Sequence, residues 1–311
     1  MLLLGLALLL PAISSLSAAY CRTLEPEDLP TLKTRLHTWD AKNIYALAVD
    51  SVRETVMTRF AGDRYVKYLF CNANASSYGV IVGTDYSNDS LQLFSDDWCS
   101  TVLLCPGWSL AGATWTRSDS EILIVGESLS NGKAFGLYRL NLETGSTTRI
   151  CGLVEPRDIA PSGVDVVQVG GSVYLSYGRE TPVFQVDVLT GSSRALSING
   201  QVFAFREELL GVVTREGLSF LNIRTGEKEE KVEGNVVGVP SFDPCQKRLA
   251  FLLLEHLQNG RFGKRGRVLH FLDLSAGETV MIGGVVRRGF ERRPQYYDPG
   301  MLAEVTERRK S

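Results

Sequence analysis

Leu137-Tyr138-Arg139-Leu140-Asn141-Leu142-Glu143-Thr144-Gly145 is the clearest strand signal in this chain, because apolar and polar residues alternate and a glycine follows. Alternation with a period of two is typical of a β-strand with one buried face, and glycine favours a tight turn after it. The pattern recurs, each time followed by residues that can return as a second strand. Three further copies are clear and two are degenerate: residues 183–191, 218–226 and 269–277, and residues 44–52 and 91–99.

The copies are spaced at a nearly constant interval. They end at residues 52, 99, 145, 191, 226 and 277, so neighbours are 47, 46, 46, 35 and 51 residues apart. A period of about 45 residues indicates one supersecondary unit repeated around an axis, with each unit burying its apolar face on the next. Aliphatic runs before the hairpins predict inner strands at residues 78–83, 122–125, 173–177, 210–213 and 249–253. The chain is therefore predicted to be all-β, a six-bladed β-propeller over residues 44–305.

The two ends of the repeat region predict how the ring closes. Residues 297–305 repeat the pattern of residues 242–251, which opens the sixth unit, but the chain ends before another unit is complete. The hairpin of residues 44–60 lacks an opening half. We therefore expect one blade built from both termini, residues 44–60 with residues 295–305, because such closure removes exposed sheet edges.

The chain begins with a targeting pattern. Residues 2–10 are almost all leucine, and Ser17 and Ala19 fit the small-residue rule for a signal-peptide cleavage site after Ala19. The apolar run is shorter than the roughly 20 residues that a membrane-spanning helix needs. We expect residues 1–19 to be a signal peptide and the protein to be secreted or in the lumen of the secretory pathway, without a transmembrane anchor. A buried N-terminal strand or helix is the alternative.

Short segments flank the propeller region. Residues 20–43 are expected to be a lead-in, either a short helix or an extended segment, because Leu29, Leu32, Leu36 and Trp39 recur at helical spacing. Residues 306–311 are expected to be a polar tail.

Cysteines and sequons are consistent with this compartment. Six cysteines remain after cleavage, and an even number in a secreted chain suggests disulfides. They are Cys21, Cys71, Cys99, Cys105, Cys151 and Cys245. The candidate bridges are Cys105–Cys151 between neighbouring blades or Cys99–Cys105 within one, with buried free thiols as the alternative. Glycosylation sequons begin at Asn74 and Asn88.

Two turn-and-strand segments, residues 115–125 and 242–251, are similar to the repeats of the TolB-type, WD-like propeller family. Each has an aromatic residue, a turn of Ser, Asp or Pro, and then an apolar strand. The hairpins that end at Gly145 and Gly226 resemble the third and fourth strands of that repeat. The resemblance implies a propeller fold and a habit of binding proteins or peptides. It carries no shared catalytic residues.

Residues for nucleophilic catalysis are scarce in this sequence. The three histidines are His37, His256 and His270, and no nucleophile elbow of the form GxSxG occurs. A serine or cysteine nucleophile needs a base beside it, usually histidine, so a catalytic triad is not expected.

A metal site is no better defined. No cysteine or histidine pair has metal spacing. No cofactor is predicted; the alternative is calcium in the central channel, which some six-bladed propeller enzymes hold with Asp, Asn and Glu. Asp165, Asn235, Asp298 and Glu304 on inner segments are its candidate oxygen ligands.

The most unusual local stretch is basic. Residues 259–267 lie between two predicted strands, and their Arg261, Lys264, Arg265 and Arg267 make a local positive field. We interpret the stretch as a long loop that either binds an acidic partner or is merely solvated. The net charge of −2 gives no general attraction to nucleic acid, and none is expected as a partner.

These observations favour a secreted binding protein. We expect it to recognise a protein or a glycan through its face loops, without catalysis. The alternative is a metal-dependent hydrolase or lyase centred on the channel of the same fold.

Overall fold

The computed structural model describes residues 21–23, 35–39, 43–48, 53–71, 77–83, 88–94, 100–116, 118, 120–128, 132–153, 163–206, 208–242, 248–257, 264–273 and 278–285. Within these ranges the chain forms strands and turns and no helix. The strands pair almost entirely in antiparallel fashion. The all-β class is therefore confirmed.

The strands form five hydrogen-bonded sheets. The first holds β2 (Arg35–Trp39), β3 (Asn43–Ala48) and β4 (Arg53–Arg59). The second holds β5 (Tyr65–Cys71), β6 (Tyr78–Gly83), β7 (Asp89–Phe94), β8 (Ser100–Trp115), β9 (Glu121–Ser128), β10 (Lys133–Asn141) and β11 (Thr147–Gly152).

The remaining three sheets follow the same meander. One holds β12 (Asp165–Val169), β13 (Ser172–Ser176), β14 (Pro182–Asp187) and β15 (Ser193–Asn199), and the next holds β16 (Gln201–Arg206), β17 (Leu209–Val213), β18 (Gly217–Asn222) and β19 (Lys228–Glu233). The last holds β20 (Val236–Phe242), β21 (Arg248–Leu257), β22 (Lys264–Asp273), β23 (Glu278–Val285) and β1 (Cys21–Thr23).

Strand β8 belongs to two groups of strands in turn. Residues 100–104 and Trp108 pair with β7, whereas residues 108–115 pair with β9, and the register is irregular on both sides. The seven-stranded sheet is therefore two consecutive four-stranded units that share one long strand. In the first unit β8 is the last strand, and in the second it is the first.

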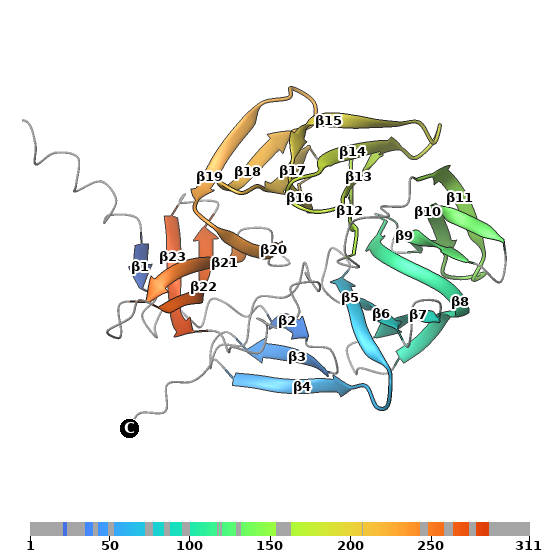
Figure 1. Cartoon of the computed structure of the whole chain (residues 1–311), viewed down its shortest axis with the longest axis horizontal. Coiled ribbons are helices and arrows are strands. Elements are labelled where there is room, and N and C mark those ends of the chain that lie inside the picture. Colours follow the sequence, from blue (N-terminus) through green and yellow to red (C-terminus); the bar gives the residue numbers. More distant parts are fainter. Residues whose placement is uncertain are drawn as a thin grey trace, which may run out of the picture.

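The first strands of successive units lie next to one another. Strand β5 contacts β8, β8 contacts β12, β12 contacts β16, and β16 contacts β20. Figure 1 shows the sheets following one another around a common centre in sequence order, with these first strands on the inside. The order of the sheets is the one that a repeated meander predicts.

Three of the predicted hairpins have the same turn, built from the same atoms. The side-chain Oδ1 of the last strand residue accepts two backbone N–H groups, and a glycine with positive φ closes the turn. The pairs are Asn141 with Gly145, Asp187 with Gly191 and Asn222 with Gly226. Asn and Asp stabilise such turns through their side chains, and glycine tolerates positive φ. These copies of the repeat are confirmed as hairpins.

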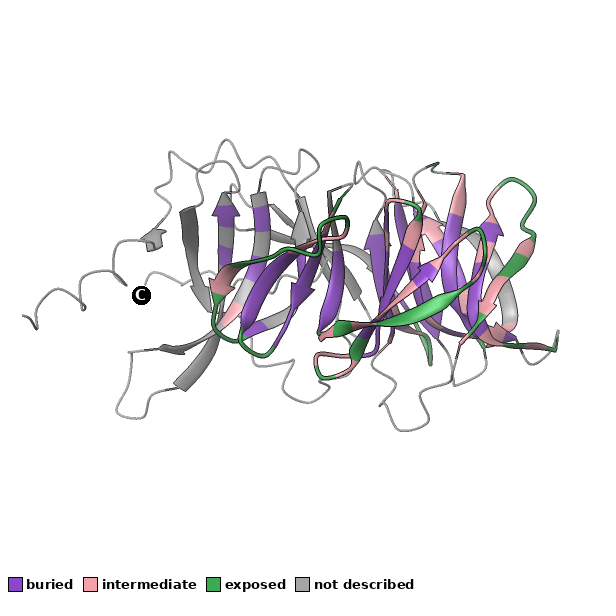
Figure 2. Ribbon diagram, turned by 90° about the horizontal axis from the view of Figure 1, so that it is seen from above, coloured by how far each residue is buried: buried purple, intermediate pink, exposed green. Residues whose placement is uncertain are grey.

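The core lies between neighbouring sheets. One buried cluster joins Leu123 and Val125 of β9 to Val166 and Val173 of the next sheet, and the following interfaces are filled in the same way. Figure 2 shows buried residues along the inner strands and exposed residues at the outer ones. The sheets β12–β15 and β16–β19 therefore bury both faces, as the repeat predicts.

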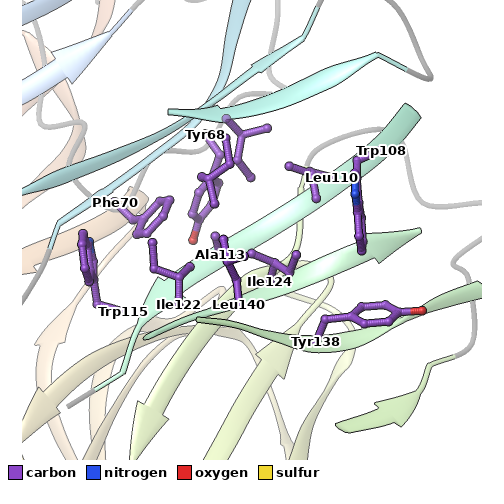
Figure 3. Packing of buried hydrophobic residues seen from close by; sticks show 12 residues of the cluster. Tyr68, Phe70, Trp108, Leu110, Ala113, Trp115, Ile122, Ile124, Tyr138 and Leu140 are labelled. Atoms are coloured by element: carbon purple, nitrogen blue, oxygen red, sulfur yellow. The ribbon is translucent and has the colours of Figure 1, made fainter. Parts of the chain in front are cut away.

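Aromatic residues fill the interface within the second sheet. The rings of Trp108 and Tyr138 meet edge to face with their centroids 5.4 Å apart. The ring centroids of Phe70 and Trp115 are 6.4 Å apart. Figure 3 shows these rings on either side of Ile122 and Ile124, with Phe70 and Trp115 on strands of different units. Such pairs add about 0.5–1.5 kcal/mol each beyond their buried area.

At one point the first strands of two units touch through their backbones. The N–H of Val164 donates to the carbonyl of Ala111 at 2.7 Å, just before β12 begins. A Cβ at Gly112 would lie 2.0 Å from the carbonyl oxygen of Val164. Glycine is therefore required at residue 112 by the close approach of β8 and β12.

The N-terminal lead-in differs from its helical interpretation. Leu36 and Trp39 lie in strand β2, which pairs with β3 in antiparallel register from Arg35↔Ala48 to Trp39↔Ile44. Leu29 and Leu32 lie outside the described residues. Of the two alternatives for the lead-in, the extended segment is therefore the one found for residues 35–39, because pairing with β3 outweighs a local helical spacing.

Two further differences concern the strand count of each unit. The sequence predicted the inner strands β6, β9, β13, β17 and β21, but it missed β5, β12, β16 and β20, which lie nearer the centre. It also missed β1, which adds to the outer edge of β23 in parallel register. The predicted signal peptide (1–19), closing strand (295–305) and tail (306–311) lie outside the described residues. No helix among the described residues is long and apolar enough to cross a membrane.

Candidate functional site

A buried carboxylate stands at the start of strand β12. Asp165 is 6% exposed, and its Oδ2 accepts hydrogen bonds from the hydroxyl of Ser176 at 3.2 Å and from Nε2 of Gln201 at 3.3 Å. The Ser176 hydroxyl in turn accepts the backbone N–H of Val202 at 3.0 Å. Because Ser176 ends β13 and Gln201 begins β16, this carboxylate joins two neighbouring sheets.

The hydrogen bonds continue outward from Gln201. Its Oε1 accepts Nε of Arg179 at 3.0 Å, and Nη1 of Arg179 donates to Oδ1 of Asn235 at 3.2 Å. Asn235 directly precedes β20, so the chain of contacts reaches a third sheet. We call Asp165, Ser176, Arg179, Gln201 and Asn235 the inter-sheet network.

The network marks one face of the ring. Asp165, Gln201 and Asn235 lie at the starting ends of the innermost strands, where the turns between second and third strands also lie. Residues 177–181 and 214–216 are such turns, and Arg215 and Glu180 form an ion pair between them. This end of the molecule is the network face.

Burial raises the pKa of Asp165 to about 7, because desolvation of the carboxylate outweighs its hydrogen bonds to Gln201 and Ser176 and the positive charge of Arg179. A carboxyl group whose pKa is raised on folding lowers the free energy of unfolding when it is ionised. Such groups are more common at functional sites than elsewhere.

Asp165→Asn is expected to change how stability depends on pH. Between the unfolded pKa of 3.8 and the folded value of about 7, the folded state holds the proton that the unfolded state has lost. The free energy of unfolding of the native protein should therefore fall with rising pH, relative to the variant, by roughly 1.4 kcal/mol per pH unit in this window. Urea unfolding of both proteins from pH 4 to 8 measures the difference, and parallel curves would contradict the assignment.

The predicted calcium ligands do not form a cation site among the described residues. Asp165 and Asn235 belong to the same network, but they are linked only through Gln201 and Arg179, and Nη1 of Arg179 donates to Oδ1 of Asn235. The described part of the chain holds no cluster of three or more acidic, histidine or cysteine side chains suited to a metal. Asp298 and Glu304 lie outside it.

The described part of the basic stretch, residues 264–267, is a strand and not a loop. Lys264, Arg265 and Arg267 belong to strand β22, where Leu257↔Lys264, His256↔Arg265 and Leu254↔Arg267 are paired. Arg261 lies outside the described residues. The prediction of a long loop over residues 259–267 was therefore wrong for 264–267, because the hairpin of β21 and β22 is longer than the repeat suggests.

This hairpin extends beyond its sheet. Strand β20 pairs with β21 only as far as Val236↔Leu253, and β23 pairs with β22 only as far as Val268↔Val285. Within the part of the chain that the structure describes, residues 254–257 and 264–267 therefore pair only with each other, and we call them the basic arm. Because Val236 follows Asn235 directly, the basic arm rises from the network face beside Asn235.

Comparison with known proteins identifies the architecture. No protein-family model matches the chain, and no curated protein matches it significantly. Among solved structures it is similar to TolB from Acinetobacter baumannii, with a TM-score of 0.55, 11% identity, and coverage of 79% of this chain and 62% of TolB. The fold is that of a β-propeller of the TolB type.

Two other structures agree with this propeller fold. A protein of unknown function from Bacteroides caccae has a TM-score of 0.54 at 13% identity, covering 80% of this chain and 93% of its own. Puromycin hydrolase has a TM-score of 0.52 at 13% identity, covering 83% of this chain and 44% of its own. This chain spans less than two thirds of the length of TolB and of puromycin hydrolase.

The histidines occupy strands of the propeller. His270 is 1% exposed and stacks on Phe251 with ring centroids 5.6 Å apart, so it packs within the last sheet. His37 lies in β2 and His256 in β21. His270 is therefore a packing residue of the last sheet.

Of the predicted cysteine and glycosylation sites, the structure places two side chains. Cys151 in β11 is a free thiol, so no Cys105–Cys151 bridge is formed here. Asn88 is exposed just before β7. Asn74 lies outside the described residues, as do the side chains of the other five cysteines, whose bonding stays a prediction.

Sequence reasoning missed Ser176, Arg179 and Gln201. Ser176 was assigned only to an inner strand, and Arg179 sits in a turn that the repeat does not mark. Gln201 begins β16, an innermost strand that was not predicted. The one usable signal is the position of three polar residues in the repeat. Asp165, Gln201 and Asn235 are spaced by 36 and 34 residues, and each follows a glycine by one or two residues at the start of an apolar strand.

Proposed function

We propose that this chain is a secreted, six-bladed β-propeller that binds a partner protein through its network face, without catalysis. The observation that carries the proposal is the inter-sheet network beside the basic arm. The network holds polar side chains of three sheets at one end of the ring. A partner bound at that end would contact side chains from several units.

Two observations support six blades. Strand β8 divides the seven-stranded sheet into two units, so the five sheets correspond to six units, one of which has three strands. The incomplete unit is β2–β4, the one that the sequence assigns to closure by residues 295–305. A fourth, innermost strand supplied by the C-terminal segment would give that unit the same number of strands as its neighbours.

The charge of the basic arm favours an acidic segment as the partner's contact. Among its eight residues, Lys264, Arg265 and Arg267 are basic and Glu255 is the one acidic residue, whereas the whole chain has a net charge of −2. Complementary charge speeds encounter and selects the partner, and it weakens as salt screens it. A protein with a run of Asp or Glu residues fits this surface.

Removing the charge of the basic arm is expected to weaken binding of an acidic polypeptide. The triple variant Lys264→Gln, Arg265→Gln and Arg267→Gln should raise the Kd for poly-L-glutamate at least about tenfold at low ionic strength. Titration calorimetry of the full chain measures this effect, and the affinity of the native protein should fall as salt is added.

A matched variant controls for total charge. Arg149→Gln, Lys228→Gln and Lys231→Gln remove three positive charges from the outer strands β11 and β19. That variant should keep its Kd within about threefold of the native value. Equal weakening in both triple variants, or none in the arm variant, would argue against the network face as the binding surface.

Secretion is expected to leave two chemical marks. Expressed in a eukaryotic secretory pathway, the protein should begin at Tyr20 after cleavage, and Asn88 should carry a glycan because its side chain is exposed. Sequencing of the amino terminus checks the first mark. A mobility shift on glycosidase treatment that is reduced in Asn88→Gln checks the second, and a mature protein that keeps residues 1–19 would contradict secretion by this route.

The alternative function is a hydrolase or lyase, and one observation favours it. Asp165 has a pKa of about 7, the range in which a carboxyl group can act as a general acid or base. The variant Asp165→Asn distinguishes the binding proposal from the enzyme proposal. Because the amide oxygen of asparagine can still accept from Ser176 and Gln201, the network should persist, and a binding protein should keep its affinity for poly-L-glutamate. An enzyme that uses Asp165 as acid or base should lose at least about a hundredfold in rate on its substrate.

A further inference from the structure

The face opposite the network carries a second feature, a cavity of about 340 Å³ between the sheets β12–β15 and β16–β19. It lies where β12 ends and β13 begins, and the turns before β17 and after β18 form its far side. Its volume is near the lower end of the range of about 300–1,000 Å³ that is usual for small-molecule sites. None of its side chains belongs to the inter-sheet network.

One wall of the cavity is polar and held in place by hydrogen bonds. Nε2 of Gln185 donates to the hydroxyl of Ser172 at 2.9 Å, and Oε1 of Gln185 accepts Nε of Arg194 at 2.8 Å. The two bonds fix which end of the Gln185 amide faces Ser172. The wall therefore presents a hydroxyl and an amide in a defined orientation before any ligand arrives.

The other wall carries an ion pair. Oε2 of Glu208 lies 3.5 Å from Nη2 of Arg224, and both side chains are largely exposed. The backbone N–H of Ile223 donates to the carbonyl of Glu208 at 2.9 Å, which ties the two turns together. The carboxylate of Glu208 and the guanidinium of Arg224 offer a hydrogen-bond acceptor and a donor side by side, and together they carry no net charge.

The floor is apolar and the rim is open. Val169 is 2% exposed, and Ile223 packs against the same buried cluster. Gly170 and Gly171 form the turn at the rim, and a Cβ at Gly171 would meet no atom within 4 Å. Small residues at this turn leave the entrance clear.

We propose that this cavity binds a neutral saccharide unit. A sugar ring has hydroxyl groups that both donate and accept, which suits Ser172, Gln185 and the Glu208–Arg224 pair, and C–H faces that suit an apolar floor. The Glu208–Arg224 pair has no net charge, so it gives no net electrostatic attraction to an anion or to a cation. A hydroxylated, uncharged ligand can donate to Glu208 and accept from Arg224, and so uses both members of the pair.

The test is direct binding of neutral sugars to the full chain. The probes are glucose, galactose, mannose, N-acetylglucosamine and their disaccharides, followed by saturation-transfer NMR and by titration calorimetry. We expect at least one of them to bind with a Kd in the millimolar range. Gly171→Phe should abolish that binding by filling the entrance, and Gln185→Ala should weaken it by about fivefold or more.

A control variant distinguishes a blocked cavity entrance from non-specific effects of an added aromatic ring on the surface. Leu189 is 93% exposed in the turn between β14 and β15 on this same face, so Leu189→Phe adds an aromatic ring outside the cavity. It should leave sugar binding unchanged. Failure of every sugar in the panel to bind would overturn the proposal, as would equal binding by Gly171→Phe, or displacement of the bound sugar by inorganic phosphate.

Discussion

Lys67→Met is expected to lower the free energy of unfolding by about 3–5 kcal/mol, because it would strip a buried carboxylate of its cation. Nζ of Lys67 in β5 lies 2.6 Å from Oδ2 of Asp89 in β7, and Asp89 is fully buried. The same oxygen accepts the backbone N–H of Leu110 in β8 at 2.7 Å. One ion pair thus ties together three strands of the second sheet.

Chemical denaturation of the native protein and two further variants measures this effect. Lys228→Met removes a surface ion pair with Glu230 at 3.2 Å and should cost less than about 1 kcal/mol. Adding Asp89→Asn to Lys67→Met should recover part of the loss, since a neutral amide oxygen can still accept from Leu110. A Lys67→Met protein within about 1 kcal/mol of the native one would show that the pair is not the buried tie we describe.

Gly112→Ala is expected to cost about 3 kcal/mol or more, which is the upper range for overpacking. The new methyl group would lie 2.0 Å from the backbone oxygen of Val164, so β8 and β12 must move apart. That movement would open the buried cluster around Val125 and Val166 and strain the hydrogen bond from Val164 to Ala111.

Gly171→Ala is the matched substitution for this test. A Cβ at Gly171 meets nothing within 4 Å, and its φ is not positive, so the free energy of unfolding should change by less than about 0.5 kcal/mol. Thermal or urea unfolding of both variants makes the comparison. If Gly112→Ala proved as stable as Gly171→Ala, the contact between these two units would be looser than the structure shows.

The repeat could be predicted because each hairpin carries its signal locally. Asn141 with Gly145 and Asn222 with Gly226 make their turns from residues four apart, so the pattern is visible in the sequence itself. The innermost strands carry no such local signal. Strand β16 is buried against neighbouring units, and its place in the ring depends on contacts with β12 and β20.

The site was harder to predict for the same reason. Asp165 and Asn235 were recognised as residues on inner segments, but what they bind depends on Arg179 and Gln201, which come from two different sheets. The charge of the basic arm was evident from Lys264, Arg265 and Arg267. That these residues lie in a strand beside Asn235 follows only from the pairing of β20, β21 and β22.

Hydrogen exchange with and without poly-L-glutamate tests the proposed binding surface most directly. The account predicts slower amide exchange in residues 254–257 and 264–267 of the basic arm and in the turns 177–181 and 214–216, all on one face. The outer strands β11 and β19 should exchange at unchanged rates. Protection confined to those outer strands, or to the cavity face, would contradict the account.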